Sequence, residues 1–217
     1  MAAEALTSAS LSWHGFAGDR RWAFVRPQSG QNGFPWHTIR ENPLMCNYVP
    51  RLVDPDRPDR SAVEVTAPDG RVYELADPEL AGRLGAGLRL MRLNRGLFDP
   101  MPVSLITAST VSALCGLAGV PAAELRFRPN LVVTPASGAP HAEEEWVGRQ
   151  LRVGEAIIRI DRRDSRCVIV NVDPATGRQD AATLKIVGSC NDACAGVYGT
   201  PVAPGVVAVG DPVILVP

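Results

Sequence analysis

Short runs of alternating apolar and polar residues, separated by glycine and proline, extend through most of the chain. A period of two is typical of strands, and frequent turn residues between the runs indicate short strands. Pro50 would confine one run to the edge of a sheet, because proline has no N–H to give to the ladder. The pattern predicts strands at residues 22–25, 48–53, 63–66, 72–75, 88–93, 131–134, 151–153, 156–160, 196–198, 206–209 and 213–216.

The period becomes helical in two places. Apolar residues at i, i+3, i+4 and i+7 predict a helix that begins after Thr107 or Ser109 and ends at Gly119. Thr107 or Ser109 would act as its N-cap, and Gly119 would stop it. Cys115 lies on the apolar stripe of this helix and is expected in the core. A second, short helix is predicted at 77–84, since Asp77 can cap it. About ten strands with one or two short helices indicate a mostly-β, barrel-like domain.

Residues 161–177 carry the candidate chemistry. Val168, Val170 and Val172 alternate with polar residues, which predicts a strand with a buried valine face. Cys167 would begin on the opposite face, shortly after Arg162, Arg163 and Arg166. A nearby guanidinium favours the thiolate, the form that attacks sulfur or binds metal. The alternative interpretation is that Cys167 is a small buried apolar residue with a structural role.

Length, composition and charge narrow the protein class. The 217 residues could form one large β domain or two small ones, and the net charge of -1 gives no reason to expect a nucleic-acid or membrane surface. No apolar run reaches the roughly 18 residues of a spanning helix. Residues 1–12 lack the basic start and long apolar block of a secretion signal, so a cytoplasmic protein is expected. Five irregularly spaced cysteines argue against a disulfide framework.

Several other chemistries are disfavoured. Lys185 is the only lysine, which makes pyridoxal-phosphate chemistry within this chain unlikely. Cys190 and Cys194 could share a helical turn, but no second ligand pair follows for zinc. The acidic run 143–145 could hold a divalent ion, although a solvated turn is the simpler interpretation. The sequence contains neither the phosphate-binding motif GxGxxG nor a Walker loop.

A set of short motifs occurs in one order along the chain. They are Gly18-Asp19-Arg20-Arg21-Trp22, Phe127-Arg128-Pro129-Asn130, Glu144-Glu145-Trp146-Val147-Gly148, Ser165-Arg166-Cys167, Val172-Asp173-Pro174, Thr176-Gly177 and Val209-Gly210-Asp211-Pro212. Together they resemble the MOSC domain, the family named for the C-terminal part of molybdenum-cofactor sulfurase. The resemblance runs from about residue 15 to residue 216. It implies a single MOSC-type β-barrel domain over 1–217, with a variable segment at 1–14.

The resemblance also implies a site. The cysteine at the position of Cys167 would carry sulfur or ligate the molybdenum of a bound molybdopterin. The phosphate and pterin would be bound by arginine and amide side chains, and further polar groups would line the site. The residues implied are Arg20, Asp99, Thr107, Thr110, Arg128, Asn130, Ser165 and Arg166. A helix N-terminus with forked arginines is a good anion site, and thiolate is a sensible molybdenum ligand.

Three functions follow as hypotheses. The first is a molybdenum-cofactor-binding oxidoreductase component, which would need an electron-transfer protein as partner because no ferredoxin-like cysteine cluster is present. The second is a sulfur carrier that receives a persulfide on Cys167 from a separate pyridoxal-phosphate cysteine desulfurase. The third is a non-catalytic binding module. Residues 1–14 lack the Pro-Val-Lys-Ser type motif of larger relatives, and this departure from the family pattern keeps the third hypothesis open.

Overall fold

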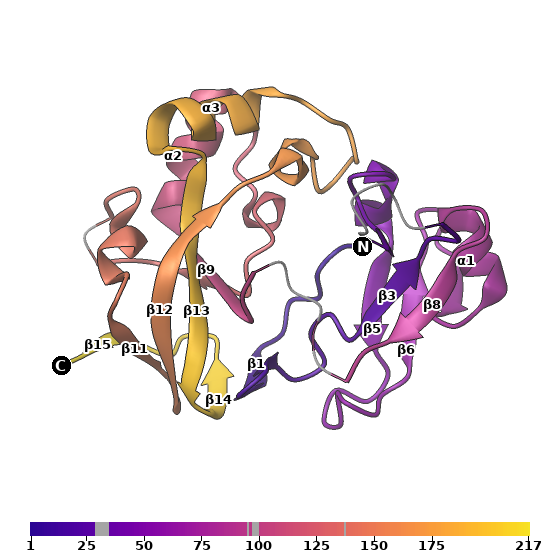
Figure 1. Cartoon of the computed structure of the whole chain (residues 1–217), viewed down its shortest axis with the longest axis horizontal. Coiled ribbons are helices and arrows are strands. Elements are labelled where there is room, and N and C mark those ends of the chain that lie inside the picture. Colours follow the sequence, from indigo (N-terminus) through magenta and orange to yellow (C-terminus); the bar gives the residue numbers. More distant parts are fainter. Residues whose placement is uncertain (29–34, 95, 97–99, 137) are drawn as a thin grey trace. The chain divides into compact units, whose positions relative to one another are not determined.

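The computed structural model describes residues 1–28, 35–94, 96, 100–136 and 138–217 (Figure 1). The chain divides into two compact units. Unit 1 contains Met1–Glu4, Gly18–Leu97 and Val172–Gln179, and unit 2 contains Ala5–Ala17, Phe98–Asn171 and Asp180–Pro217. The single MOSC-like domain over 1–217 stays a prediction.

Unit 1 is built from two small antiparallel sheets. One has the strand order β4-β3-β8 and the other β5-β6-β7. The β5 strand lies at an edge, as Pro50 predicted, and the hairpin expected at 63–66 and 72–75 is confirmed as β6 and β7. The bounds are β3 Trp22–Val25, β4 Trp36–His37, β5 Val49–Leu52, β6 Val63–Thr66, β7 Val72–Glu74 and β8 Arg89–Arg92, with the 3₁₀ helix η1 at Pro43–Asn47.

Unit 2 contains a curled, half-barrel sheet of six strands in the order β10-β9-β13-β12-β11-β15. The neighbours are antiparallel except β9 and β10, which are parallel. The bounds are β9 Val103–Thr107, β10 Leu131–Val133, β11 Gln150–Val153, β12 Ala156–Ser165, β13 Cys194–Ala203 and β15 Val213–Val216. A smaller sheet has the order β14-β1-β2, with bounds β1 Ser8–Ser12, β2 Gly15–Phe16 and β14 Gly205–Ala208.

The strand β9, which lies between β10 and β13, is covered on both faces. Val103 and Leu105 belong to one apolar cluster, which is shared with β11 and β12. Ile106 points to the other face, where it packs with the helices of unit 2 and with Val170. All five residues of β9 are buried, so this strand does not show the alternation of buried and exposed residues that is typical of a strand with one face in solvent.

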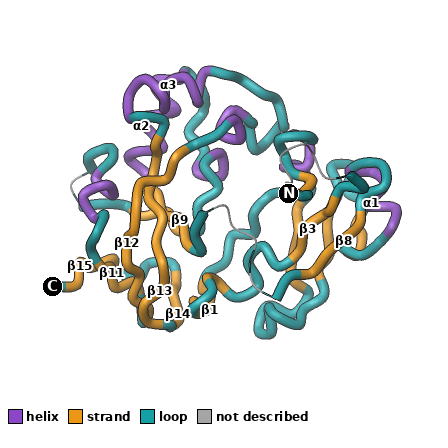
Figure 2. The backbone as a smooth tube through the Cα atoms, in the orientation of Figure 1, coloured by secondary structure: helices purple, strands orange, loops and turns teal. Residues whose placement is uncertain are grey.

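Three α-helices occur in the described residues, one more than the upper expectation (Figure 2). The predicted helices are confirmed as α1 (Pro78–Leu84), capped by Asp77, and α2 (Ala108–Ala118), capped by Thr107 and stopped by left-handed Gly119. The third, α3 (Ala182–Asn191), packs against α2. None of the described helices is both long enough and apolar enough to pass through a bilayer.

The strand predicted at 168–172 is wrong. Val168–Asn171 forms a 3₁₀ helix, η4. Val170 is 2% exposed and packs with α2 and α3, whereas Val168 is 45% exposed. In a 3₁₀ turn, residues two apart no longer share a face, so the alternation of valines carries no strand register here. Tertiary packing of Val170 overrides the strand propensity of the run.

A substitution at Gly196 would test how closely β13 approaches β9. It has φ +80, and an added Cβ would lie 2.6 Å from the carbonyl oxygen of Leu105. Gly196→Ala is therefore expected to lower the free energy of unfolding by about 2–4 kcal/mol, from backbone strain and overpacking. Gly116 lies in α2 with nothing within 4 Å of an added Cβ. Gly116→Ala should stabilise the protein by about 0.5–1 kcal/mol, and urea unfolding of both variants measures the contrast.

Candidate functional site

Cys167 lies in the short link between the end of β12 and the start of η4. Its side chain is partly exposed, unlike the buried Cys46 and Cys115. Cys115 is 0% exposed, which confirms its predicted place in the core. The burial of Cys167 therefore differs from that of the two cysteines that fill the interior.

Hydrogen bonds fix the backbone on both sides of Cys167. Before it, the Arg166 N–H donates to the Ala193 carbonyl at 2.7 Å. After it, the Val170 N–H donates to the Cys167 carbonyl at 3.2 Å, and Arg126 Nη1 donates to the Val170 carbonyl at 3.3 Å. Arg126 is only 2% exposed. The link that contains Cys167 is thus held by the residue before β13 on one side and by a buried arginine on the other.

The three arginines that precede Cys167 each have a partner of their own. Arg162 lies over the Tyr198 ring, with its guanidinium carbon 5.9 Å from the ring centre. Arg163 Nε pairs with Glu144 Oε2 at 2.9 Å, and its Nη2 donates to the Asn191 carbonyl. Arg166 pairs with Asp164 and donates to two backbone carbonyls, described below. The thiolate expected from their proximity in sequence stays a prediction.

Arg128 and Asn130 lie on the loop that enters β10. Arg128 has φ 51, a left-handed conformation that is uncommon for a residue with a side chain and that often marks functional sites. The Asn130 side chain accepts from the Ser104 N–H at 3.0 Å, while the Asn130 N–H donates to the Ser104 carbonyl at 2.9 Å. The amide of Asn130 therefore extends the β9–β10 ladder by one step and fixes the loop in which half-exposed Arg128 lies.

The side chain of Glu143 lies buried at the N-terminus of α2. Glu143, Thr107 and Thr110 are each 0% exposed. Glu143 Oε2 accepts from Thr107 Oγ1 at 2.7 Å and from Thr110 Oγ1 at 2.9 Å, and Oε1 accepts from the Thr107 N–H at 3.3 Å. The expectation of a solvated turn at 143–145 is wrong for Glu143. The group that occupies the N-terminus of α2 is therefore the carboxyl of Glu143, and binding of a cofactor phosphate at this helix stays a prediction.

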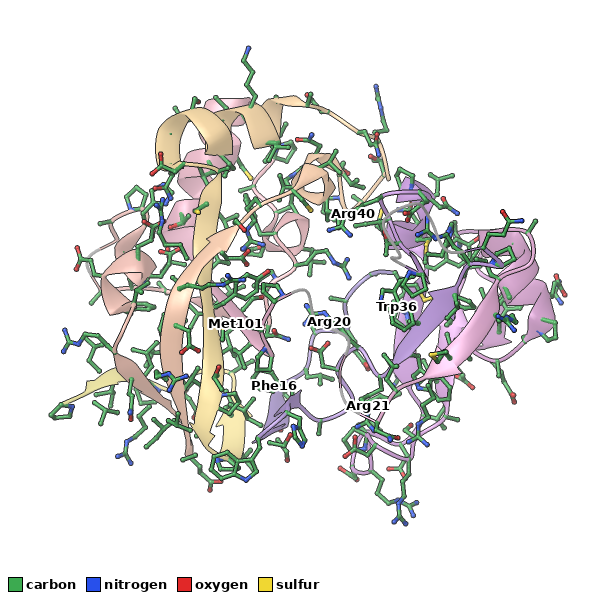
Figure 3. All side chains as sticks on the ribbon, in the orientation of Figure 1. Phe16, Arg20, Arg21, Trp36, Arg40 and Met101 are labelled. Atoms are coloured by element: carbon green, nitrogen blue, oxygen red, sulfur yellow. The ribbon has the colours of Figure 1, made fainter. Side chains whose placement is uncertain are left out.

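The remaining implied residues are spread over the chain. Ser165 is the exposed last residue of β12 and pairs in register with Cys194. Arg20 belongs to unit 1, in the turn before β3, where Figure 3 labels it. It has φ 48, and its Nη1 pairs with Asp19 Oδ2 at 2.8 Å. Asp99 lies outside the described residues.

The segment that follows η4 is fixed by its own polar side chains. Asn171 Oδ1 accepts from the Leu184 N–H at 2.8 Å, which anchors the first turn of α3. Asp173 Oδ1 accepts from the N–H groups of Ala175 and Thr176 at 3.0 and 2.9 Å, and Gly177 has φ 71. The predicted turn at 173–177 is confirmed as an Asx turn.

Sequence reasoning missed the environment of Cys194. This residue begins β13, and Cys190 lies in α3, so the two do not share a helical turn. Burial raises the pKa of the Cys194 thiol, and the Arg163 guanidinium partly opposes this rise. The thiol is therefore protonated at neutral pH and is a poor nucleophile. No cluster of three or more metal-ligating side chains occurs among the described residues.

Comparison with known proteins decides the family. Residues 95–214, more than half of the chain, match the MOSC domain family. The chain belongs to the MOSC domain family. Its MOSC sequence is 28% identical over 130 residues to human mitochondrial amidoxime-reducing component 1, covering 54% of this chain and 37% of that protein. The mouse protein of the same name is 31% identical over 102 residues, covering 41% of this chain and 29% of that protein.

The match therefore spans about a third of the length of these two relatives. Among solved structures, YiiM from Geobacillus stearothermophilus aligns with a TM-score of 0.40 and 16% identity, covering 54% of this chain and 55% of that chain. The YUAD protein from Bacillus subtilis aligns with a TM-score of 0.48 and 10% identity, covering 97% of this chain and 85% of that chain.

The buried carboxylate of this MOSC domain offers a stability test. Glu143→Gln keeps the shape of the side chain but replaces one acceptor oxygen with a donor that faces hydroxyl and N–H donors. The free energy of unfolding should fall by about 1–3 kcal/mol. Glu145 is exposed in the same 3₁₀ helix, η3 (Ala142–Trp146), so Glu145→Gln is the matched control and should change it by less than about 0.5 kcal/mol. Equal effects in a denaturant titration would contradict the assignment.

Proposed function

We propose that this chain is a molybdenum-cofactor-binding component of an oxidoreductase, with Cys167 as the metal ligand. The observation that supports the proposal best is that Cys167 is a partly exposed cysteine on a backbone fixed from both sides. Thiolate is a soft ligand that suits such a metal. Membership of the MOSC family, which is associated with the molybdenum cofactor, points to the same chemistry.

The hydrogen bonds of the implied residues support fewer direct cofactor contacts than the sequence implied. Thr107 and Thr110 direct their hydroxyls to Glu143, and Asn130 directs its carbonyl oxygen to β9. Arg128 and Ser165 retain side chains at the surface of unit 2. We therefore assign Cys167 to the metal, Arg128 to the phosphate and Ser165 to a polar contact nearby. Arg20 of unit 1 and Asp99 stay predicted contacts.

The reaction class follows from the relatives' name. They are amidoxime-reducing components, so we propose a reduction, in which the cofactor supplies the two-electron redox chemistry when bound. In this chain Cys167 would hold the metal of the cofactor, and the Arg128 guanidinium would bind its phosphate through forked hydrogen bonds. An electron-transfer protein would act as partner, and a cytoplasmic location stays a prediction.

Metal analysis tests this proposal. Protein purified from a molybdenum-replete host should contain molybdenum and pterin, and Cys167→Ser should lower the molybdenum content at least about tenfold because it removes the ligand. Cys190 is exposed and outside the proposed site, so Cys190→Ser is the matched control. Because Cys167 is not in the core, its substitution should change the free energy of unfolding by less than about 0.5 kcal/mol. A Cys167→Ser protein with full metal content would refute the ligand assignment.

A sulfur carrier is the second candidate, favoured by the same accessible Cys167 and by the presence of only one lysine, Lys185. In that case a separate cysteine desulfurase would load a persulfide on Cys167. Mass spectrometry after incubation with the desulfurase and cysteine should show one added sulfur atom on the Cys167 peptide and none on the Cys194 peptide, because burial keeps that thiol protonated. If neither metal nor sulfur is found on Cys167, the binding-module hypothesis would be favoured.

A further inference from the structure

Asp164 and Arg166 form a buried ion pair at the end of β12, directly before Cys167. Arg166 Nη2 lies 2.7 Å from Asp164 Oδ2, and their side chains are 8% and 1% exposed. Such a pair loses its hydration and is stable only when further hydrogen bonds satisfy the remaining donors. The hydrogen bonds of the Arg166 guanidinium therefore identify the segments that the ion pair connects.

The Arg166 guanidinium joins three segments of unit 2. Its Nε donates to the Ala195 carbonyl at 2.7 Å, and its Nη1 donates to the Phe127 carbonyl at 2.7 Å. The guanidinium carbon also lies 5.7 Å from the centre of the Phe127 ring. β12, the start of β13 and the loop before β10 are thus connected through one planar fork. Lysine could not reproduce this arrangement, because its ammonium has no fixed fork.

A second buried arginine connects the same two loops in the opposite direction. Arg126, which directly precedes Phe127, donates to the Val170 carbonyl in η4. Arg166, which directly precedes Cys167, donates to the Phe127 carbonyl. Each loop therefore sends an arginine to a carbonyl of the other. Cys167 lies between the two contact points of its loop, Arg166 and Val170, and Arg128 directly follows Phe127 on the other loop.

We infer that Arg166 is a positioning residue that, paired with Asp164, holds the Cys167 sulfur and the Arg128 guanidinium in a fixed arrangement, so that one bound molecule can meet both. This inference rests on the proposed function, and it replaces direct cofactor binding as the role of Arg166. It predicts that an anionic reagent is directed to Cys167 by Arg128 only while the Arg166 fork is intact.

The test measures alkylation of Cys167 and needs no bound cofactor. In a Cys190→Ser/Cys194→Ser background, the rate with anionic iodoacetate is divided by the rate with neutral iodoacetamide. This ratio cancels changes in thiol ionisation and general exposure. Arg128→Gln should lower it about threefold or more, since the local positive charge that attracts the anion is lost. Arg166→Lys should lower it by a similar factor, although the charge opposite Asp164 is kept.

Two further variants separate positioning from stability. Asp164→Val/Arg166→Met replaces the buried ion pair with apolar side chains, which commonly leaves stability near that of the original pair, yet the forked contacts are lost. Its ratio should stay low even when its unfolding midpoint is close to that of the parent protein. Arg162 is exposed on the same strand, so Arg162→Lys is the matched control and should leave the ratio unchanged.

The outcomes are distinguishable. An unchanged ratio in Arg166→Lys, or a ratio restored in the double variant, would overturn the inference. Failure of both Arg166 variants to fold would also overturn it, in favour of a purely structural role. An unmetallated parent protein with a ratio that depends on Arg166 would count against the proposed molybdenum function and leave the positioning role in place.

Discussion

The burial of charged side chains is the constraint on which the site of unit 2 depends. Arg126, Glu143, Asp164 and Arg166 are almost completely removed from water. An ion in the interior costs several kcal/mol unless partners replace its hydration. Three of these side chains make hydrogen bonds that fix a loop: Glu143 at the start of α2, Arg126 at η4 and Arg166 at the link before Cys167, while Asp164 forms the ion pair with Arg166. The rigidity around the sulfur follows from these buried charges.

This constraint divides the polar residues of the site into two groups. Thr107, Thr110 and Asn130 satisfy groups of the protein itself, so their contribution to a ligand would be indirect. Arg20 and Arg128, by contrast, are non-glycine residues in the left-handed region. Such conformations cost about 1–3 kcal/mol and persist where the surroundings impose them. His141, Asp192 and Ala193 share this conformation, so the anion-binding role that the family resemblance implies for Arg20 and Arg128 stays a prediction.

The sequence predicted what short-range chemistry determines. The caps of α1 and α2, the Asx turn at Asp173 and the edge position of Pro50 all depend on neighbouring residues, and all are confirmed. It did not predict interactions between distant residues. The Thr107–Glu143 bond joins residues 36 apart and the Arg126–Val170 bond residues 44 apart. Without those contacts, an acidic run resembles a solvated turn and the valines of η4 resemble a strand.

The same contacts explain how Cys167 can be fixed close to a boundary between units. The chain leaves unit 2 after Asn171 and enters unit 1 at Val172, a few residues beyond the sulfur. The next turn is anchored in unit 1, where Asn47 Nδ2 donates to the Ala175 carbonyl at 2.7 Å. Val170 and Asn171, however, are bound by Arg126 and by the Leu184 N–H of unit 2. The position of Cys167 is therefore set by hydrogen bonds inside unit 2, and the turn in unit 1 is held by separate ones.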